Sequence, residues 1–241
     1  MSALTILWFI FVALLPGLFW LWFYRRQDNP FDQEPLRLIF KTFLYGAAIA
    51  LPAVALEFAA DFFFSFSISQ NFLVIVFGAL FVIAPIEEFL KYWVVKKTIY
   101  HQPTFSEPLD GIIYCISAGL GFASFENLLV VFSEGESAIL LRFATATLMH
   151  AIASGIVGYY LGRAKFLKNK GGKGSLITFG LVSAILLHGV YNIVVSANTP
   201  FTFGLLVILM IVMYFILSAE IKKTKLLKAS KAVNKMQVRC E

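Results

Sequence analysis

Residues 85–93 read Pro-Ile-Glu-Glu-Phe-Leu-Lys-Tyr-Trp, which places two adjacent carboxylates, Glu87 and Glu88, in an apolar stretch long enough to cross a membrane. An ionisable side chain inside the bilayer is costly unless it is paired, neutralised or facing a wet cavity, so it predicts a functional site. On a helix, Lys91 lies four residues after Glu87 and three after Glu88, so either glutamate can pair with it. Adjacent residues diverge by about 100 degrees around the axis, so one carboxylate can stay available for chemistry.

The composition predicts a polytopic membrane protein. Of 241 residues, 59% are hydrophobic and 14% are charged, whereas soluble domains carry roughly a quarter charged residues. The net charge of +6 arises from basic residues in short loops and a C-terminal tail. Because these residues form no recognition module, nucleic-acid binding is excluded as a function.

Seven apolar runs predict an all-α transmembrane bundle that forms a single membrane-embedded domain over residues 1–241. Every basic cluster falls on one side if the N-terminus is outside and the C-terminus is in the cytoplasm. The expected parts are a first transmembrane helix (3–24), a cytoplasmic connector (25–37), a motif-bearing bundle (38–219) and a basic cytoplasmic tail (220–241). The later spans are expected at 38–60, 71–95, 111–132, 139–162, 176–196 and 202–219.

Polar side chains recur in three further spans. Glu126 and Asn127 are adjacent in the fourth, His150 lies in the fifth, and His188 and Asn192 share one helix face in the sixth. Because polar groups in a bundle turn inward, we expect them to converge on the double glutamate. Glu87 is expected in the cytoplasmic half of its span and Glu126 in the outer half, so convergence requires tilt, a break near Pro85 or shifted boundaries. Arg142 is expected to be an interface anchor or a counter-ion.

These residue types suit hydrolysis. Cleaving a peptide bond needs a base for water, a donor for the oxyanion and an acid for the leaving amine. No serine or cysteine pairs convincingly with a base, so direct attack by water is the simplest mechanism. Two alternatives stay open: a zinc-dependent hydrolase with Glu87, Glu126, His150 and His188 as ligands, and a proton- or cation-coupled transporter that uses the buried Glu and His residues.

The ordered motifs resemble those of the PrsW family of intramembrane proteases. Residues 87–91 look like its EExxK motif and residues 122–127 like its FxxxEN motif. Residues 150–154 and 188–192 look like its two histidine motifs. The PrsW family is in turn similar to the CAAX-type prenyl proteases, which carry a histidine where this chain has Glu126.

The resemblance implies a glutamate-dependent enzyme in a bacterial cell membrane that makes the first cut in a single-pass membrane protein, typically an anti-sigma factor. It implies that Glu87 is the general base and that His188 and Asn192 bind the oxyanion. Glu88, Glu126 and His150 are further candidate site residues, with roles that the resemblance does not define. No cofactor is required by this interpretation, although zinc fits the residue types. Membrane lipids are the other expected partners, and the sequence does not indicate an oligomeric state.

Overall fold

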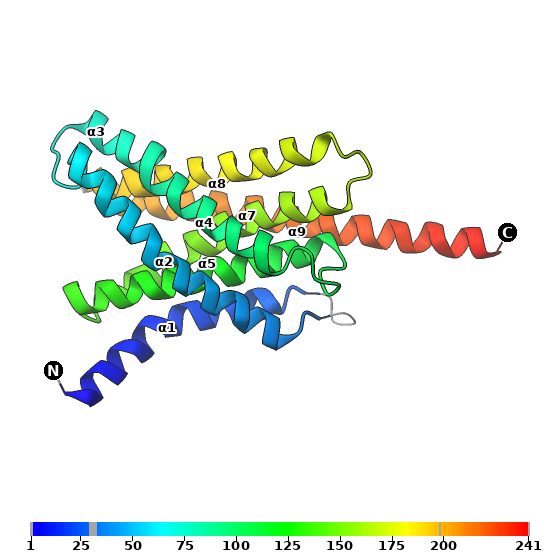
Figure 1. Cartoon of the computed structure of the whole chain (residues 1–241), viewed down its shortest axis with the longest axis horizontal. Helices are drawn as coiled ribbons and strands as arrows, with labels where there is room; N and C mark the ends of the chain where they lie inside the picture. The colour runs from blue at the N-terminus through cyan, green and yellow to red at the C-terminus, as the bar shows by residue number, and fades with distance from the viewer. Residues whose placement is uncertain (1, 29–32, 198, 241) are drawn as a thin grey trace.

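The computed structural model describes residues 2–28, 33–197 and 199–240, with side chains up to residue 226. Residues 29–32 of the expected connector and the side chains of most of the expected tail therefore lie outside the described part. Seven helices are long and apolar enough to cross a membrane, which confirms the predicted all-α bundle. The start of α1 and the end of α9 lie at opposite ends of the bundle, as seven passages require (Figure 1).

Five spans are single helices, while the third changes helix type along its length and the fifth is interrupted. The third span consists of α3, the π-helix η1 and α4, and the fifth consists of α6 and α7. The elements are α1 (Ala3–Arg25), α2 (Leu36–Phe64), α3 (Phe72–Phe77), η1 (Gly78–Ile83), α4 (Ala84–Thr98), α5 (Pro108–Glu134), α6 (Ala138–Ala144), α7 (Ala146–Phe166), α8 (Gly172–Ala197) and α9 (Thr202–Cys240).

Helices α5 and α7 form the centre of the bundle, between α1 and α2 on one side and α8 on the other (Figure 1). About two thirds of each central span is buried (67%), against 22–33% of the others. Glycines allow this contact: a Cβ on Gly158 of α7 would collide with the backbone of Gly111 on α5. Gly46 of α2 approaches the backbone of Ala118 on α5 in the same way. Small residues that let backbones approach are the usual basis of helix packing in membranes.

The third span changes helix type directly before the double glutamate. Residues Gly78–Ile83 form the π-helix, and the amide of Ala84 donates to the carbonyl of Ala79, five residues earlier. Pro85 lies in the first turn of α4, where the missing N–H of a proline costs little. A break near Pro85 was one of the three expected ways in which the carboxylates could converge, but the helix runs on from Phe72 to Thr98 with only this change of helix type.

The fifth span, expected over 139–162, is present as Ala138–Phe166, and its helix is interrupted at Thr145. The backbone of Thr145 leaves the helical region, with φ −118° and ψ −84°. Its hydroxyl donates to the carbonyl of Leu141 at 2.8 Å and accepts from the hydroxyl of Tyr191 at 3.2 Å. The break separates the short helix α6, which carries Arg142, from the central helix α7.

The end of the bundle that carries the α1–α2 connector is joined to α5 by buried carboxylates. Glu34, immediately before α2, accepts a hydrogen bond from the hydroxyl of Tyr114. Its own amide donates to Asp28 Oδ2 at 2.9 Å. Asp110 accepts from the amide of Glu107 at 2.8 Å and so caps the first turn of α5. Burial raises the pKa of Glu34 to about 8.

Candidate active site

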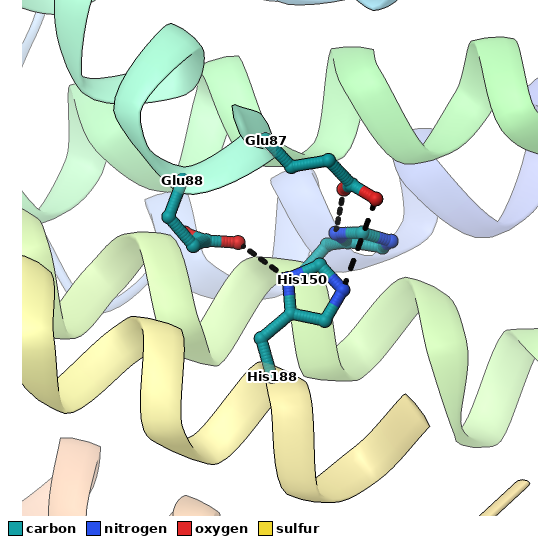
Figure 2. A group of neighbouring side chains, drawn as sticks. All are labelled: Glu87, Glu88, His150 and His188. Atoms are coloured by element: carbon teal, nitrogen blue, oxygen red, sulfur yellow. Dashed lines mark hydrogen bonds and ion pairs between the residues drawn. The ribbon is translucent and has the colours of Figure 1, made fainter. Parts of the chain in front are cut away.

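Three helices bring the predicted side chains together in one buried cluster (Figure 2). Glu87 and Glu88 come from α4, His150 from α7 and His188 from α8. Each of the four is at most 3% exposed. The rings of His150 and His188 meet edge to face, with centroids 5.0 Å apart. The predicted convergence of both histidines on the double glutamate is therefore what the structure shows.

Lys91 lies at the middle of this cluster. Its Nζ donates to Glu87 Oε2 at 2.8 Å, to Glu88 Oε1 at 2.9 Å and to His150 Nδ1 at 2.7 Å. An ammonium has three N–H donors, so these three acceptors satisfy it completely. Lys91 therefore neutralises both glutamates together rather than one of them.

His150 connects this cluster with Glu126 of α5. Its Nδ1 accepts from the Lys91 ammonium, so the ring proton lies on Nε2. Nε2 is 2.9 Å from Glu126 Oε2, to which it donates. The ring thus connects Lys91 of α4 with Glu126, and each of its nitrogens makes a hydrogen bond.

His188 makes one strong contact and leaves one nitrogen available. Its Nδ1 donates to Glu88 Oε1 at 2.8 Å. Its Nε2 lies 3.9 Å from Glu87 Oε1, too far for a direct hydrogen bond. Glu87 Oε1 accepts no hydrogen bond from any described residue, because Lys91 binds the other oxygen. The two free atoms face each other across the centre of the site (Figure 2).

Arg142 holds the outer part of the network. Its Nη2 donates to Glu126 Oε2 at 3.1 Å and its Nε to Asn127 Oδ1 at 2.7 Å. The amide of Asn127 in turn donates to Thr147 Oγ1 at 3.1 Å. Of the two roles expected for Arg142, the structure therefore supports the counter-ion. The break at Thr145 gives α6 the orientation that this contact requires.

Among the described residues, the site is most open towards Glu126. The side chains of Glu126 and Arg142 are each 23% exposed, while those of Glu87, Glu88 and Lys91 are at most 4% exposed. A hollow beside Glu88, Lys91 and Ser154 is too narrow to admit a water molecule. The exposed surface of the site is therefore greatest at the Glu126 end.

One predicted residue is not joined to the cluster. Asn192 lies on α8 one turn beyond His188 but makes no hydrogen bond to any described site residue. It is partly exposed, so its role as an oxyanion donor stays a prediction.

Three contributors were not foreseen as members of the site. Lys91 was expected to be an ion-pair partner, not the hub of three contacts. Phe122 lies under its ammonium, with Nζ 4.2 Å from the ring centroid. Thr147 supports Asn127 from α7. Phe122 belongs to the FxxxEN pattern, which is the one signal that could have indicated it.

The cluster can be tested as a site for a metal ion. One ligand atom from each of Glu87, Glu88, His150 and His188 lies within 4.8 Å of the others, and carboxylate and imidazole are zinc ligands. The set contains Glu88 in place of Glu126, the fourth ligand expected from the sequence. The donors fit zinc by type and spacing, but the Lys91 ammonium already contacts three of them. For His150 Nδ1 to bind an ion, Lys91 would have to give up its contact with that atom, whereas Glu87 Oε1 and His188 Nε2 are not bound by Lys91.

Comparison with known proteins gives consistent matches. Residues 34–218 match the family model described as "PrsW family intramembrane metalloprotease". The chain is 37% identical over 169 residues to Protease PrsW of Oceanobacillus iheyensis, covering 70% of this chain and 75% of that protein. It is 28% identical over 237 residues to Protease PrsW of Bacillus subtilis, covering 95% and 98%. No solved structure matches.

Proposed function

We propose that this chain, which belongs to the PrsW family of intramembrane proteases, cleaves a single-pass membrane protein with a water molecule activated by Glu87. The chain is a multi-pass membrane protein whose named relatives are proteases, so the transporter alternative loses its support. The proposal has three parts: the glutamate mechanism, an anti-sigma factor as the substrate and the bacterial cell membrane as the location.

One observation carries the choice of Glu87 as base. Its Oε1 faces His188 Nε2 at 3.9 Å, a separation that one water molecule hydrogen-bonded to both atoms would span. Glu88 is less suited, because its Oε1 already accepts from both Lys91 and His188. Its Oε2 is buried away from the open end of the site and accepts no hydrogen bond from a described residue.

Glu87 can carry out both proton transfers of the hydrolysis. Glu87 takes a proton from water as the oxygen attacks the peptide carbonyl carbon. The oxyanion accepts a hydrogen bond from His188, whose ring Glu88 orients through Nδ1. Glu87 then gives the proton to the leaving amine, and the carbon–nitrogen bond breaks. Lys91 holds both carboxylates in place through its hydrogen bonds.

The zinc alternative keeps specific support from the four clustered donors and from the family description. Glu87, Glu88, His150 and His188 would hold the ion. When bound, zinc would supply a Lewis acid for the carbonyl and a more acidic water. Because Lys91 already binds Glu87, Glu88 and His150, we favour the mechanism without a metal ion.

The test uses the purified full chain in vesicles with a candidate anti-sigma factor that carries one transmembrane helix. Mass spectrometry of the products identifies the cleaved bond. Glu87→Gln should reduce cleavage by at least about 10²-fold, because a general base typically contributes 10²–10⁴. Glu134→Gln, which removes an exposed carboxylate at the end of α5, is the matched control and should cleave normally.

A chelator separates the two mechanisms. Cleavage that continues after chelation supports water activation by Glu87, whereas complete inhibition that zinc reverses would establish the metal enzyme. Undiminished cleavage by a folded Glu87→Gln protein would refute the assignment of the base. Absence of cleavage by the unmodified chain with every single-pass substrate tested would count against the protease function itself.

A further inference from the structure

A groove separates the end of α1 from the middle of α9. It has a volume of about 400 Å³. Both helices pack on α5 and α7, yet within the described residues they do not pack on each other. We call this hollow the α1–α9 groove; it is lined by Phe23, Tyr24, Gln27, Tyr214, Ser218, Ile221, Lys222, Lys225 and Leu226.

The groove lies at the basic end of the bundle. Helix α1 ends there at Arg25, and the α7–α8 loop and the extended part of α9 lie at the same end (Figure 1). Basic residues at the ends of membrane helices mark the cytoplasmic headgroup level, where anionic lipids are enriched. The groove is therefore at the depth of lipid phosphates.

The polar lining of the groove is suited to an anion. Lys222 and Lys225 are exposed on one face of α9, one turn apart, and none of the lining residues carries a carboxylate. Gln27 and Ser218 add an amide and a hydroxyl that can donate. Basic pockets between transmembrane helices on the cytoplasmic side are a known form of lipid headgroup site.

Tyr24 provides an independent indication of a ligand. The residue is only 3% exposed, and its hydroxyl has no hydrogen-bond partner among the described residues. Buried polar groups in folded proteins are nearly always hydrogen-bonded, so such a hydroxyl calls for an acceptor. The residue lines the groove while its hydroxyl is buried, so a phosphate oxygen that enters between α1 and α9 would supply the missing acceptor.

The apolar lining is suited to the rest of a lipid. Phe23 and Leu226 flank the polar groups, and the outer face of α1 continues from the groove through exposed apolar side chains such as Phe19 and Leu15. An acyl chain can lie along that face while its headgroup occupies the polar part. We propose that the α1–α9 groove binds the phosphate headgroup of an anionic phospholipid, which links α9 to α1. This site is separate from the proposed active site and does not depend on the proteolytic function.

The test is native mass spectrometry of the full chain from detergent, with phosphatidylglycerol or phosphatidylcholine added. The double variant Lys222→Gln/Lys225→Gln should retain phosphatidylglycerol at least roughly tenfold less well, because each basic side chain at the headgroup level contributes about fivefold. The control is Lys168→Gln/Lys170→Gln, which removes the same charge from the exposed α7–α8 loop and should bind normally. Phosphatidylcholine should bind more weakly to the unmodified chain.

Tyr24→Phe is the second variant, because it removes only the unpartnered hydroxyl and keeps the packing of the ring. It should lower phosphatidylglycerol retention several-fold without a change in melting temperature. Equal retention by the unmodified chain and the groove double variant would overturn the proposal, as would equal losses in both lysine pairs. Displacement of phosphatidylglycerol by inorganic phosphate, relative to chloride at matched ionic strength, would show an anion site that is not specific for lipid and would also overturn it.

Discussion

Glu126 Oε2 lies 2.9 Å from Nε2 of His150, whose opposite nitrogen accepts from Lys91. The carboxylate of α5 therefore reaches the double glutamate through an imidazole and an ammonium and does not contact it directly. A carboxylate that accepts from a histidine fixes the tautomer and the orientation of the ring. We infer that Glu126 is a positioning residue for His150.

Replacement of Glu126 should have a smaller effect than replacement of Glu87. Glu126→Ala removes the acceptor of His150 Nε2 and should lower kcat about 10–100-fold, the range for loss of such a supporting contact. Glu126→Gln keeps an oxygen acceptor and should retain more activity. Steady-state cleavage assays measure both variants, and full activity of Glu126→Ala would contradict the positioning role.

Arg142 should act through Glu126 and Asn127. Arg142→Gln removes donors to both and should reduce kcat with little change in KM, since Arg142 does not touch the central cluster. Arg142→Lys should rescue only part of the activity, because one ammonium cannot reproduce the planar fork of a guanidinium. Arg37→Gln, at an exposed position on α2, is the control. An effect confined to KM would place Arg142 in substrate binding instead.

Replacement of Lys91 should lower the free energy of unfolding. Lys91→Met leaves two buried carboxylates without their cation and should cost about 3–5 kcal/mol of unfolding free energy. Adding Glu88→Gln removes one of those charges and should recover part of the loss. Denaturation of the purified proteins in detergent measures the coupling. Additive effects of the two substitutions would show that the residues are independent.

The contact between α5 and α7 should depend on Gly158. In Gly158→Ala the new methyl group meets the backbone of Gly111, so the helices must separate, at a cost of about 1–3 kcal/mol. Gly204→Ala is the matched control, because a Cβ on Gly204 in α9 would meet no atom within 4 Å. Thermal unfolding should separate the two variants. A Gly158→Ala protein that melts with the unmodified chain would mean that this close approach is absent.

Because of Glu34, the stability of the chain against unfolding should fall as the pH rises from about 4.5 to 8. Burial raises its pKa from 4.5 to about 8, so between these values the folded chain binds more protons than the unfolded chain. The stability contribution is fully present below about pH 4.5 and is lost as pH approaches 8. Glu34→Gln should flatten this slope and be relatively more stable at pH 8. Melting temperatures across pH 5–8 test this, and an unchanged slope in the variant would exclude Glu34 as its source.

Much of the fold was predictable because membrane passage imposes a simple rule of length and hydropathy. The seven spans follow from apolar runs, and the polar residues Glu87, His150 and His188 converge because charged groups avoid lipid. The break at Thr145 carries no such signal. Residues 139–162 contain no proline or other helix-breaking signal at Thr145, and the contact between Thr145 and Tyr191 forms only in the folded bundle.

The internal arrangement of the site was less predictable, because it depends on which atoms of each side chain meet. Helical spacing showed that Lys91 could pair with either glutamate, but not that it also contacts His150. Asn192 shares a helix face with His188, yet one further turn of α8 carries it out of hydrogen-bonding range of the cluster. Helix α9 continues past the expected seventh span, because the Lys-, Leu- and Ala-rich stretch after residue 219 extends it to Cys240.

The π-helix before α4 changes the directions in which side chains before and after it face around the axis of the third span. Phe77, Phe81, Phe89 and Trp93 are all well exposed, although the 16 residues from first to last would drift by about 160 degrees around a regular α-helix. One extra residue taken up in η1 removes about 100 degrees of that drift, so a single aromatic stripe can follow the lipid on both sides of the transition. Deleting one residue from 78–83 would rotate the glutamates out of the bundle or the upstream phenylalanines into it.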